Sequence, residues 1–268
     1  MKITVVTVCR NAENSIRKTI ESVLDQHFTD YEFLIIDGAS TDGTMSVIES
    51  YSVKFAEKNI PFRCISEPDN GIYDAMNKAI DRAGGEWILF MNSGDSFFDG
   101  EVLNRLIETD VSGYDIVYGN VLITENNMYK FNPAGIITDQ GFFSPICHQG
   151  MMTRTAVLRD HTYDTSLRLA ADYDSMIRIH KDGGKFKKTD LTVAVFELGG
   201  TSFKQSIRYL KEMYVSRKSI GIVSAKNQTV SVFLLGTYLF IRRISKMILG
   251  KRFYSENRGW KKDTELFD

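Results

Sequence analysis

The sequence lacks the surplus of charge, the cysteine spacing and the repeats that mark several common classes of protein. Its 33 Lys and Arg residues are balanced by 34 Asp and Glu residues, so bulk electrostatics do not favour binding of a polyanion. We therefore expect no nucleic-acid partner. Cys9, Cys64 and Cys147 are odd in number and lack metal-ligand spacing, which is typical of a reducing compartment.

A long apolar run is also missing. Residues 3–8 form a strand-like run that Cys9, Arg10 and Asn11 break, too short for a signal peptide. The apolar run 230–241 falls short of the ~20 residues that a spanning helix needs. We therefore expect a cytoplasmic protein.

The apolar run 230–241 lies within a basic stretch, 201–253, that holds eleven Lys and Arg residues against one acidic residue, Glu212. An apolar helix with a basic flank is typical of a segment that lies on an anionic membrane. One interpretation is therefore peripheral contact with the inner membrane surface. The alternative is a helix that packs on its own domain while its basic side chains are solvated.

The first half alternates strand-like and helix-like patterns, which predicts right-handed βαβ units and a mainly parallel sheet. The expected strands are 3–8, 33–36, 61–66 and 87–91, and the expected helices begin near Asn14, Thr41 and Tyr73. We therefore expect an α/β, Rossmann-like fold with helices that flank a central sheet.

The second half is less regular. Short strands are expected at 115–119, 121–124 and 128–131, an aromatic loop at 141–150, and a helix from Ala171 that ends at Gly183. Helices dominate after Gly200. The sequence thus predicts a domain of residues 1–200 and a helical, basic and amphipathic C-terminal extension of residues 201–268.

Polar and acidic residues gather where two strands end. The segment 67–78 precedes and opens the helix at Tyr73, and the segment 92–96 follows the strand 87–91. Ligands bind at the carboxyl ends of strands in α/β sheets. Carboxylates collected there suit a divalent cation and the phosphates it neutralises, so the sequence points to phosphate-bearing chemistry.

Several motifs in one order resemble family-2 glycosyltransferases with the GT-A fold. They span roughly residues 1–200, and their order makes the set specific where a single motif would be weak. The subgroup that the chain most resembles builds bacterial surface polysaccharides such as colanic-acid-type capsule. The matching segments are Thr7–Asn11, Ile35–Thr44, Gly71–Asn77, Asn92–Asp95, His148–Gln149 and Ala171–Asp174.

The resemblance implies a nucleotide-diphosphate sugar donor (a UDP- or GDP-sugar), a divalent cation (Mg²⁺ or Mn²⁺), and inversion at the anomeric carbon. It also implies a glycan or polyprenyl-linked saccharide as acceptor. The physical argument agrees, because departure of a nucleoside diphosphate concentrates negative charge that a cation stabilises in the transition state. Inversion by a single displacement needs a base for the acceptor hydroxyl.

The resemblance also assigns roles. Asp172 corresponds to the family's catalytic acid and is the expected general base, with Asp174 as the alternative if Asp172 only caps its helix. Asp95 is the expected metal ligand, and Asp99 is held in reserve. The family usually places two or three acidic groups here, whereas this chain has one carboxylate in Asn92–Asp95.

Eight further residues are expected on the donor side of the site. Structural alternatives exist for three of them: Asp37 can end its strand in a turn, Lys78 can pair with Asp74 one helical turn away, worth about 0.3–0.5 kcal/mol, and His148 can be a hydrogen-bonded structural residue. The eight are Thr7, Arg10, Asp37, Asp69, Asn77, Lys78, Asn92 and His148.

Two other functions fit parts of the pattern. A nucleotidyltransferase shares acidic metal sites at strand ends, but it normally carries a glycine-rich, basic phosphate loop near the N-terminus, where residues 7–14 have only Arg10. A non-catalytic scaffold that retains the fold would explain the reduced acidic motif. The oligomeric state is left open by the sequence.

Overall fold

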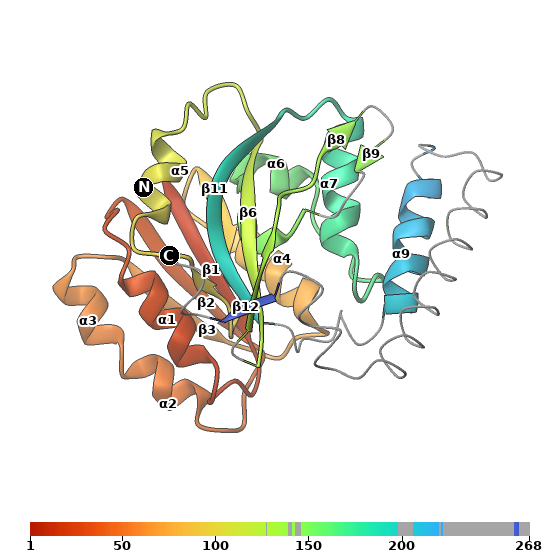
Figure 1. The fold of residues 1–268 in the computed structure, drawn as a ribbon. Coiled ribbons are helices and arrows are strands. Elements are labelled where there is room, and N and C mark those ends of the chain that lie inside the picture. The colour runs from red at the N-terminus through yellow and green to blue at the C-terminus, as the bar shows by residue number, and fades with distance from the viewer. Residues whose placement is uncertain are drawn as a thin grey trace.

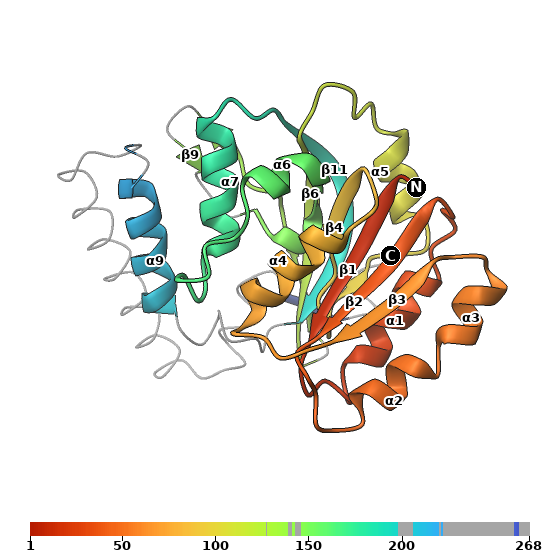
Figure 2. The ribbon, with the colours of Figure 1, turned by 180° about the vertical axis from the view of Figure 1, so that it is seen from behind.

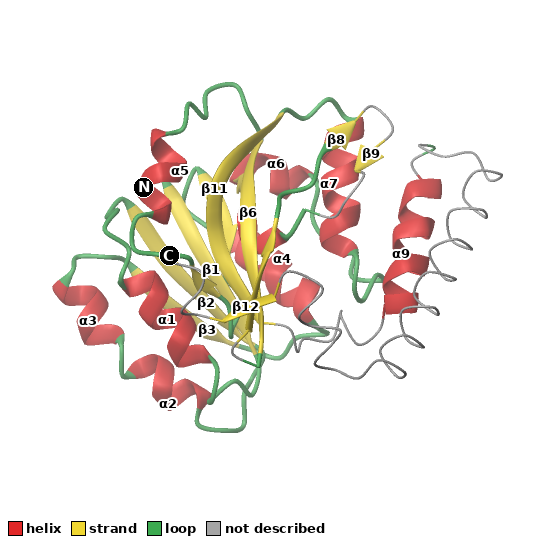
Figure 3. Cartoon of the chain, in the orientation of Figure 1, coloured by secondary structure: helices red, strands yellow, loops and turns green. Residues whose placement is uncertain are grey.

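The computed structural model describes residues 1–126, 128–138, 141–142, 146–197, 206–219, 221 and 260–262. A curved sheet lies at its centre, with helices on either side (Figures 1 and 3). The first four large strands are parallel to one another: β1 (Ile3–Cys9), β2 (Tyr31–Asp37), β3 (Phe62–Ser66) and β4 (Trp87–Phe90). Both β1 and β2 are buried along their whole length because helices cover both faces of this part of the sheet.

Two hydrophobic clusters occupy the two faces. Val5 and Phe33 pack in the cluster formed with α1 (Ile16–Leu24), α2 (Thr44–Glu49) and α3 (Ser52–Glu57). Val6 and Leu34 pack on the opposite face with α4 (Ile72–Arg82), which Figure 2 shows from behind. Successive side chains of a strand point to opposite faces, which explains the alternation. The carboxyl ends of β1, β2 and β3 meet in register, with Cys9 opposite Asp37 and Asp37 opposite Ser66.

The second half contributes one long strand where the sequence suggested two. We expected strands at 115–119 and 121–124, but β6 (Ile116–Glu125) runs through without a break. The buried Asn120 is the physical reason, because its amide nitrogen donates to the carbonyl of Asp190 at 2.9 Å and its oxygen accepts from the N–H of Ala134 at 2.9 Å. A polar residue that is satisfied in this way does not interrupt a buried strand.

The rest of the sheet is mixed. β10 (Met151–Arg154) lies antiparallel between β4 and β6, β7 (Met128–Asn132) is antiparallel to β6, and β11 (Phe186–Glu197) is parallel to β6 and antiparallel to β5 (Ser96–Phe97). The strand β11 was not anticipated. The remaining elements before residue 200 are α5 (Val102–Glu108), β8 (Ile137–Thr138), β9 (Gly141–Phe142), the 3₁₀ helix η1 (His148–Gly150), α6 (Thr155–Asp160) and α7 (Ala171–Lys181).

Two described elements follow residue 200, and both contact the first part of the chain. Helix α9 (Ser206–Ser219) packs against α7, and β12 (Trp260–Lys262) pairs antiparallel with β7 at the edge of the sheet. The sheet order is therefore β12-β7-β6-β10-β4-β1-β2-β3. The apolar run 230–241 lies outside the described residues. Within the described part of the chain, no helix is both long enough and apolar enough to cross a bilayer.

Candidate functional site

Asp37, at the end of β2, is fully buried, and its carboxylate is occupied by its own surroundings. The Ser40 N–H and the Ser66 hydroxyl donate to Oδ2 at 2.9 and 2.6 Å, and the Ser40 hydroxyl donates to Oδ1 at 2.5 Å. Burial acts to raise the pKa of Asp37, but these hydrogen bonds outweigh it and lower the pKa. The carboxylate thus fixes the loop after β2, and its contact with the donor stays a prediction.

Asp69 lies over the next residue of that loop, Gly38. A Cβ atom at Gly38 would lie 2.1 Å from Asp69 Oδ2 and 3.2 Å from Cδ of Arg10, so any side chain there would displace the carboxylate. The other oxygen of Asp69 accepts from the N–H of Gly71 at 2.9 Å. Asp69 and Arg10 are therefore brought together above the end of the sheet, and their contact with the donor stays a prediction.

Three other expected donor-side residues are bonded within the protein. Thr7 is fully buried, and its hydroxyl donates to the carbonyl of Met91 at 2.6 Å, which ties β1 to the segment after β4. The Asn77 amide bonds to both backbone groups of Tyr163, donating at 2.8 Å and accepting at 2.9 Å. Their roles as donor ligands stay predictions.

Lys78 is the third of these residues. Its ammonium donates to the carbonyl of Pro68 at 2.6 Å and lies 3.5 Å from Glu67 and 3.7 Å from Asp74. The Asp74 contact is the ion pair that helical spacing allowed as the alternative. Lys78 therefore holds the segment before α4 in place, and its contact with a diphosphate also stays a prediction.

Asp95 follows β4 and is almost completely buried. The Gln149 side chain donates to its Oδ2 at 3.0 Å. Burial raises the pKa of Asp95 to about 6, against the smaller opposing effects of the Gln149 hydrogen bond and the nearby His148. Burial away from water disfavours the charged form of a carboxylate. A bound cation would compensate for that cost, so the position of Asp95 suits a metal ligand.

His148 joins the two halves of the site. Its Nε2 lies 3.0 Å from Nδ2 of Asn92, and its Nδ1 lies 3.2 Å from Oδ2 of Asp172. An amide nitrogen can only donate, so Nε2 accepts, and the proton of the neutral ring then sits on Nδ1 and is donated to Asp172. Gln149, the next residue in η1, bonds Asp95, so adjacent residues reach the two carboxylates.

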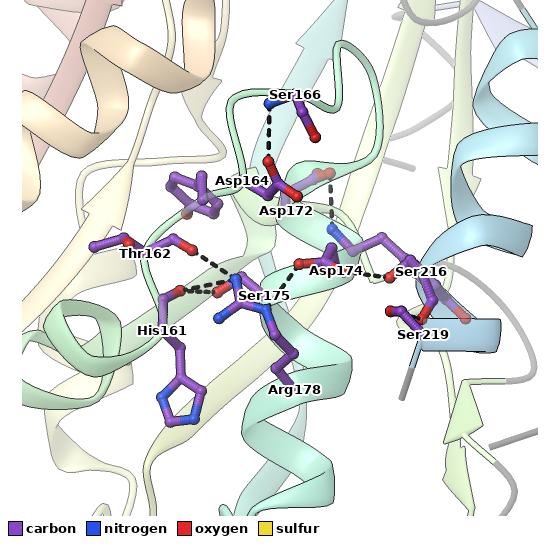
Figure 4. Close-up of polar contacts among 12 residues, drawn as sticks. His161, Thr162, Asp164, Ser166, Asp172, Asp174, Ser175, Arg178, Ser216 and Ser219 are labelled. Atoms are coloured by element: carbon purple, nitrogen blue, oxygen red, sulfur yellow. Dashed lines mark hydrogen bonds and ion pairs between the residues drawn. The ribbon is translucent and has the colours of Figure 1, made fainter. Parts of the chain in front are cut away.

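Asp172 stands in the first turn of α7 and is held on two sides. Besides the His148 contact, its Oδ1 accepts from the Tyr73 hydroxyl at 3.0 Å and from the N–H of Tyr173 at 2.9 Å. Asp174, the alternative base, is instead engaged elsewhere: Arg178 donates to it at 2.8 Å and Ser216 at 2.5 Å (Figure 4). The geometry favours Asp172 over Asp174 as the carboxylate near the donor-side residues.

The side chains near Asp95 offer few ligands for a divalent cation. Within the described residues, no group of three or more His, Cys, Asp and Glu side chains could hold one. However, the buried Oδ1 of Asn92 has no hydrogen-bond partner there. One carboxylate and one amide oxygen are hard ligands, and Mg²⁺ commonly binds through one or two carboxylates plus substrate phosphates. The donor set fits a cation that shares its coordination with a diphosphate.

Asp99, the reserve ligand, does not join this group. It pairs with Arg105 and accepts from the N–H of Glu101 at the start of α5. Tyr73 and Gln149 were not assigned roles from the sequence, although both lie inside the quoted motifs. Their roles depend on contacts across 99 and 54 positions of the chain, which no local spacing reveals.

Comparisons with known proteins support the fold and the resemblance. The family model described as Glycosyl transferase family 2 matches residues 4–175. A relative from Mycobacterium bovis (strain BCG / Pasteur 1173P2), named PGL/p-HBAD biosynthesis glycosyltransferase, is 32% identical over 164 residues, which cover 59% of this chain and 62% of the relative. The chain thus spans less than two thirds of that relative's length.

Two further matches are a relative found by sequence and a solved structure. The GalNAc(5)-diNAcBac-PP-undecaprenol beta-1,3-glucosyltransferase of Campylobacter jejuni is 29% identical over 140 residues, covering 52% of this chain and 44% of that protein. A mannosyltransferase structure from Pyrobaculum calidifontis, in complex with GDP-Man and Mn²⁺, superposes with a TM-score of 0.63 at 14% identity, covering 95% of this chain and 82% of that one. The expected α/β fold of the GT-A type is confirmed.

Proposed function

The chain belongs to glycosyl transferase family 2, and from that membership we propose that it transfers a sugar from a nucleotide-diphosphate donor, with inversion, to a glycan or lipid-linked glycan. The observation that carries the proposal is the bonded chain Asn92–His148–Asp172. It links the segment after β4, where Asp95 lies, to the carboxylate proposed as base. We infer that the product is part of a cell-surface polysaccharide.

On the donor side, we propose that Asp95 and the Asn92 oxygen would hold a divalent cation together with the diphosphate. Such a cation supplies positive charge beside the departing phosphate oxygens. The mannosyltransferase with the similar fold contains GDP-Man and Mn²⁺, which supports a UDP- or GDP-sugar donor and a Mg²⁺- or Mn²⁺-like ion. Asp69 and Arg10 would contact the nucleoside end, because their side chains lie together beyond the carboxyl end of β2.

On the acceptor side, Asp172 would take the proton of the attacking hydroxyl as the new glycosidic bond forms. The hydrogen bonds from Tyr73 and His148 orient its carboxylate. Asp174 is less suited to the role because Arg178 and Ser216 already bind both of its oxygens.

The acceptor and the place of action are further proposals. The Campylobacter jejuni relative is named for an undecaprenol-linked substrate, which supports a polyprenyl-linked saccharide as acceptor. A basic extension over residues 201–268 would bring the protein to the inner membrane surface where such a lipid is found. The division into residues 1–200 and 201–268 is kept as a functional division only, because α9 and β12 both contact the first part.

Thermal unfolding with nucleotides tests the donor side. We expect UDP or GDP to raise the melting temperature of the wild-type protein more with Mn²⁺ than without it, because a ligand that binds only the folded state stabilises it. At a ligand concentration of 100 times Kd the gain is about 2.7 kcal/mol. Asp95→Asn should lose the part that depends on Mn²⁺, whereas Asp99→Asn, a matched control nearby, should retain it.

The same experiment decides between the proposal and its alternatives. A wild-type protein that no nucleoside diphosphate stabilises, with or without the metal, would contradict the transferase proposal and support a scaffold. Release of UDP or GDP from a panel of UDP- and GDP-sugars then tests for chemistry. Stabilisation by a nucleoside triphosphate with formation of pyrophosphate would instead support a nucleotidyltransferase.

A further inference from the structure

Helix α9 lies beside α7 in both ribbon views, and two of its buried polar residues bond to the start of α7 (Figures 1 and 2). These residues are Glu212 and Ser216, one helical turn apart. The family match ends at residue 175, so α9 lies beyond the part of the chain that the family model describes. Its contacts nevertheless reach the segment that carries the proposed base.

Glu212 accepts hydrogen bonds from three consecutive backbone N–H groups. Its Oε2 lies 3.0 Å from the nitrogen of Arg168, 2.7 Å from that of Leu169 and 3.1 Å from that of Ala170. Its other oxygen accepts from Nε of Arg208 at 2.9 Å. Burial acts to raise the pKa of Glu212, but the backbone N–H groups and Arg208 outweigh it and lower the pKa. The carboxylate therefore sits charged in a row of backbone donors.

This contact lies just before α7 and is not a helix cap, because the three bonded N–H groups belong to residues 168–170, whereas α7 begins at Ala171. Ala170 precedes the first residue of α7, and no side chain of its own caps the helix there. The N-terminus of a helix favours negative charge, because its first N–H groups are unpaired and its dipole points there. Glu212 adds negative charge beside this end from α9, across more than 40 positions of sequence, while Asp172 and Asp174 carry it in the first turn itself. The entry into α7 is thus fixed by another helix.

The segment is also fixed from the donor side. The guanidinium of Arg168 donates to the carbonyl of Asn70 at 2.9 Å, next to Asp69 and just before α4. Within α4, Tyr73 donates to Asp172 itself. Residues 168–172 are therefore held between α9 and the start of α4, and the Glu212 contact lies two residues before the base.

A second contact limits rotation of α7. Ser216 donates to Asp174 at 2.5 Å, and Asp174 also accepts from Arg178, which donates in turn to the carbonyl of Thr162 at 2.6 Å (Figure 4). Asp172 and Asp174 point to different partners on the first turn of one helix. Fixing Asp174 against α9 therefore limits how far Asp172 can swing from its partners Tyr73 and His148.

We propose that Glu212 is a positioning residue for Asp172, and that α9 supports the catalytic site through this residue although the helix lies outside the family-matched segment. The proposal rests on the proposed function, which makes Asp172 the base. Glu212 itself touches neither substrate nor reacting atoms. It fixes the backbone of residues 168–170, and hence the distance from the carboxylate to the acceptor hydroxyl.

Three variants of the full chain test this proposal. Glu212→Ala removes the acceptor, Glu212→Gln retains one neutral acceptor oxygen, and Lys211→Ala is the matched control because Lys211 is exposed on the same helix. The rate of UDP or GDP release from the active sugar nucleotide gives kcat and KM. Hydrogen exchange of the peptide that contains residues 168–170 reports the backbone directly, without any need for activity.

We expect Glu212→Ala to lower kcat about 10- to 100-fold, because a displacement of about 1 Å from productive geometry costs about that much. The KM for the donor and the Mn²⁺-dependent binding of UDP or GDP should change less than about twofold, because the displacement affects the base and not the donor side. Hydrogen exchange at residues 168–170 should accelerate. Glu212→Gln should recover part of the lost kcat and part of the lost protection from exchange. Lys211→Ala should match the wild-type protein in every measurement.

Two outcomes would overturn the proposal. Faster exchange at residues 168–170 with an unchanged kcat would show that Glu212 only stabilises the fold. Equal losses of kcat and of nucleotide binding would place its effect on the whole protein instead of on the base. A wild-type protein with no sugar-transfer activity is a different result, since it contradicts the proposed function itself, while the exchange data would still report whether Glu212 fixes this segment.

Discussion

Asp172→Asn is the substitution that tests the proposed base most directly, and the structure allows its local consequences to be worked out. The new amide keeps an oxygen that can accept from the Tyr73 hydroxyl, now 3.0 Å from Oδ1. Its nitrogen would face Nδ1 of His148, now 3.2 Å from Oδ2. Two donors would then meet unless the proton of His148 moves to Nε2.

The new amide can avoid this conflict by turning. Its oxygen then accepts from Nδ1 of His148, and its nitrogen faces the Tyr73 hydroxyl, which can accept as well as donate. The Asn92 amide, whose oxygen is a proposed cation ligand, keeps its orientation, and the N–H of Tyr173 gives up its contact with the side chain of residue 172. We therefore expect Asp172→Asn to fold, with a melting temperature close to that of the wild-type protein.

The expected loss is in turnover. A positioned general base contributes about 10²- to 10⁴-fold to the rate. At about 1.36 kcal/mol for each factor of ten, this raises the activation free energy by about 3–5 kcal/mol. The donor KM should change less than about twofold, because the substitution removes an interaction that matters only as the proton is transferred.

The assay measures release of UDP or GDP at saturating donor, together with nucleotide binding by thermal shift in the presence of Mn²⁺. Asp174→Asn is the control, since Asp174 is also in the first turn of α7 but binds Arg178 and Ser216. It should lower stability while leaving far more turnover than Asp172→Asn. Near-normal kcat in Asp172→Asn, or a larger loss in Asp174→Asn, would refute the assignment of the base.

Three further predictions concern the donor side and its support. Asn77→Ala should lower the free energy of unfolding by about 1–3 kcal/mol for each Tyr163 backbone group left unpaired, as measured by chemical denaturation. Unchanged stability would contradict the role of Asn77 in holding the Tyr163 backbone. Gly38→Ala should weaken UDP or GDP binding in a thermal-shift titration with little change in stability, because its Cβ displaces the Asp69 carboxylate; unaltered affinity would remove Asp69 from the nucleotide site. The lowered pKa of Asp37 means that its stabilising effect is complete above the ordinary value of 3.8 and is lost as the pH falls through its lower folded-state pKa. The stability advantage of the wild-type protein over Asp37→Asn should therefore shrink with acidification in that range, and an advantage that does not depend on pH there would refute the assignment.

The sequence was informative where the signal is local. Apolar runs without polar alternation identified β1, β2 and β4, because both faces of those strands are covered. Acidic and amide residues at strand ends predicted a donor side there, since the carboxyl ends of parallel strands meet at one edge. The motif order identified the family, which the match to residues 4–175 confirmed.

The sequence pattern did not predict which groups the polar side chains bond. Asp37, Asn77 and Lys78 have the residue types of a ligand-binding site, and each is also bonded within the protein, while its contact with the donor stays a prediction. A carboxylate or an amide looks the same in sequence whether it meets a ligand or a backbone group. Only burial and neighbouring atoms distinguish the two, and these come from residues far away along the chain.

By itself, the sequence determined the α/β fold, the family and the short set of residues from which a base must be chosen. Hydrophobic periodicity and strand-end chemistry are properties of neighbouring residues, so a single chain displays them. Tertiary structure alone decided that His148 joins Asn92 to Asp172, that Asp174 is already bound, and that Glu212 of α9 holds the start of α7. Each of these contacts forms between segments that only the folded chain brings within hydrogen-bonding distance.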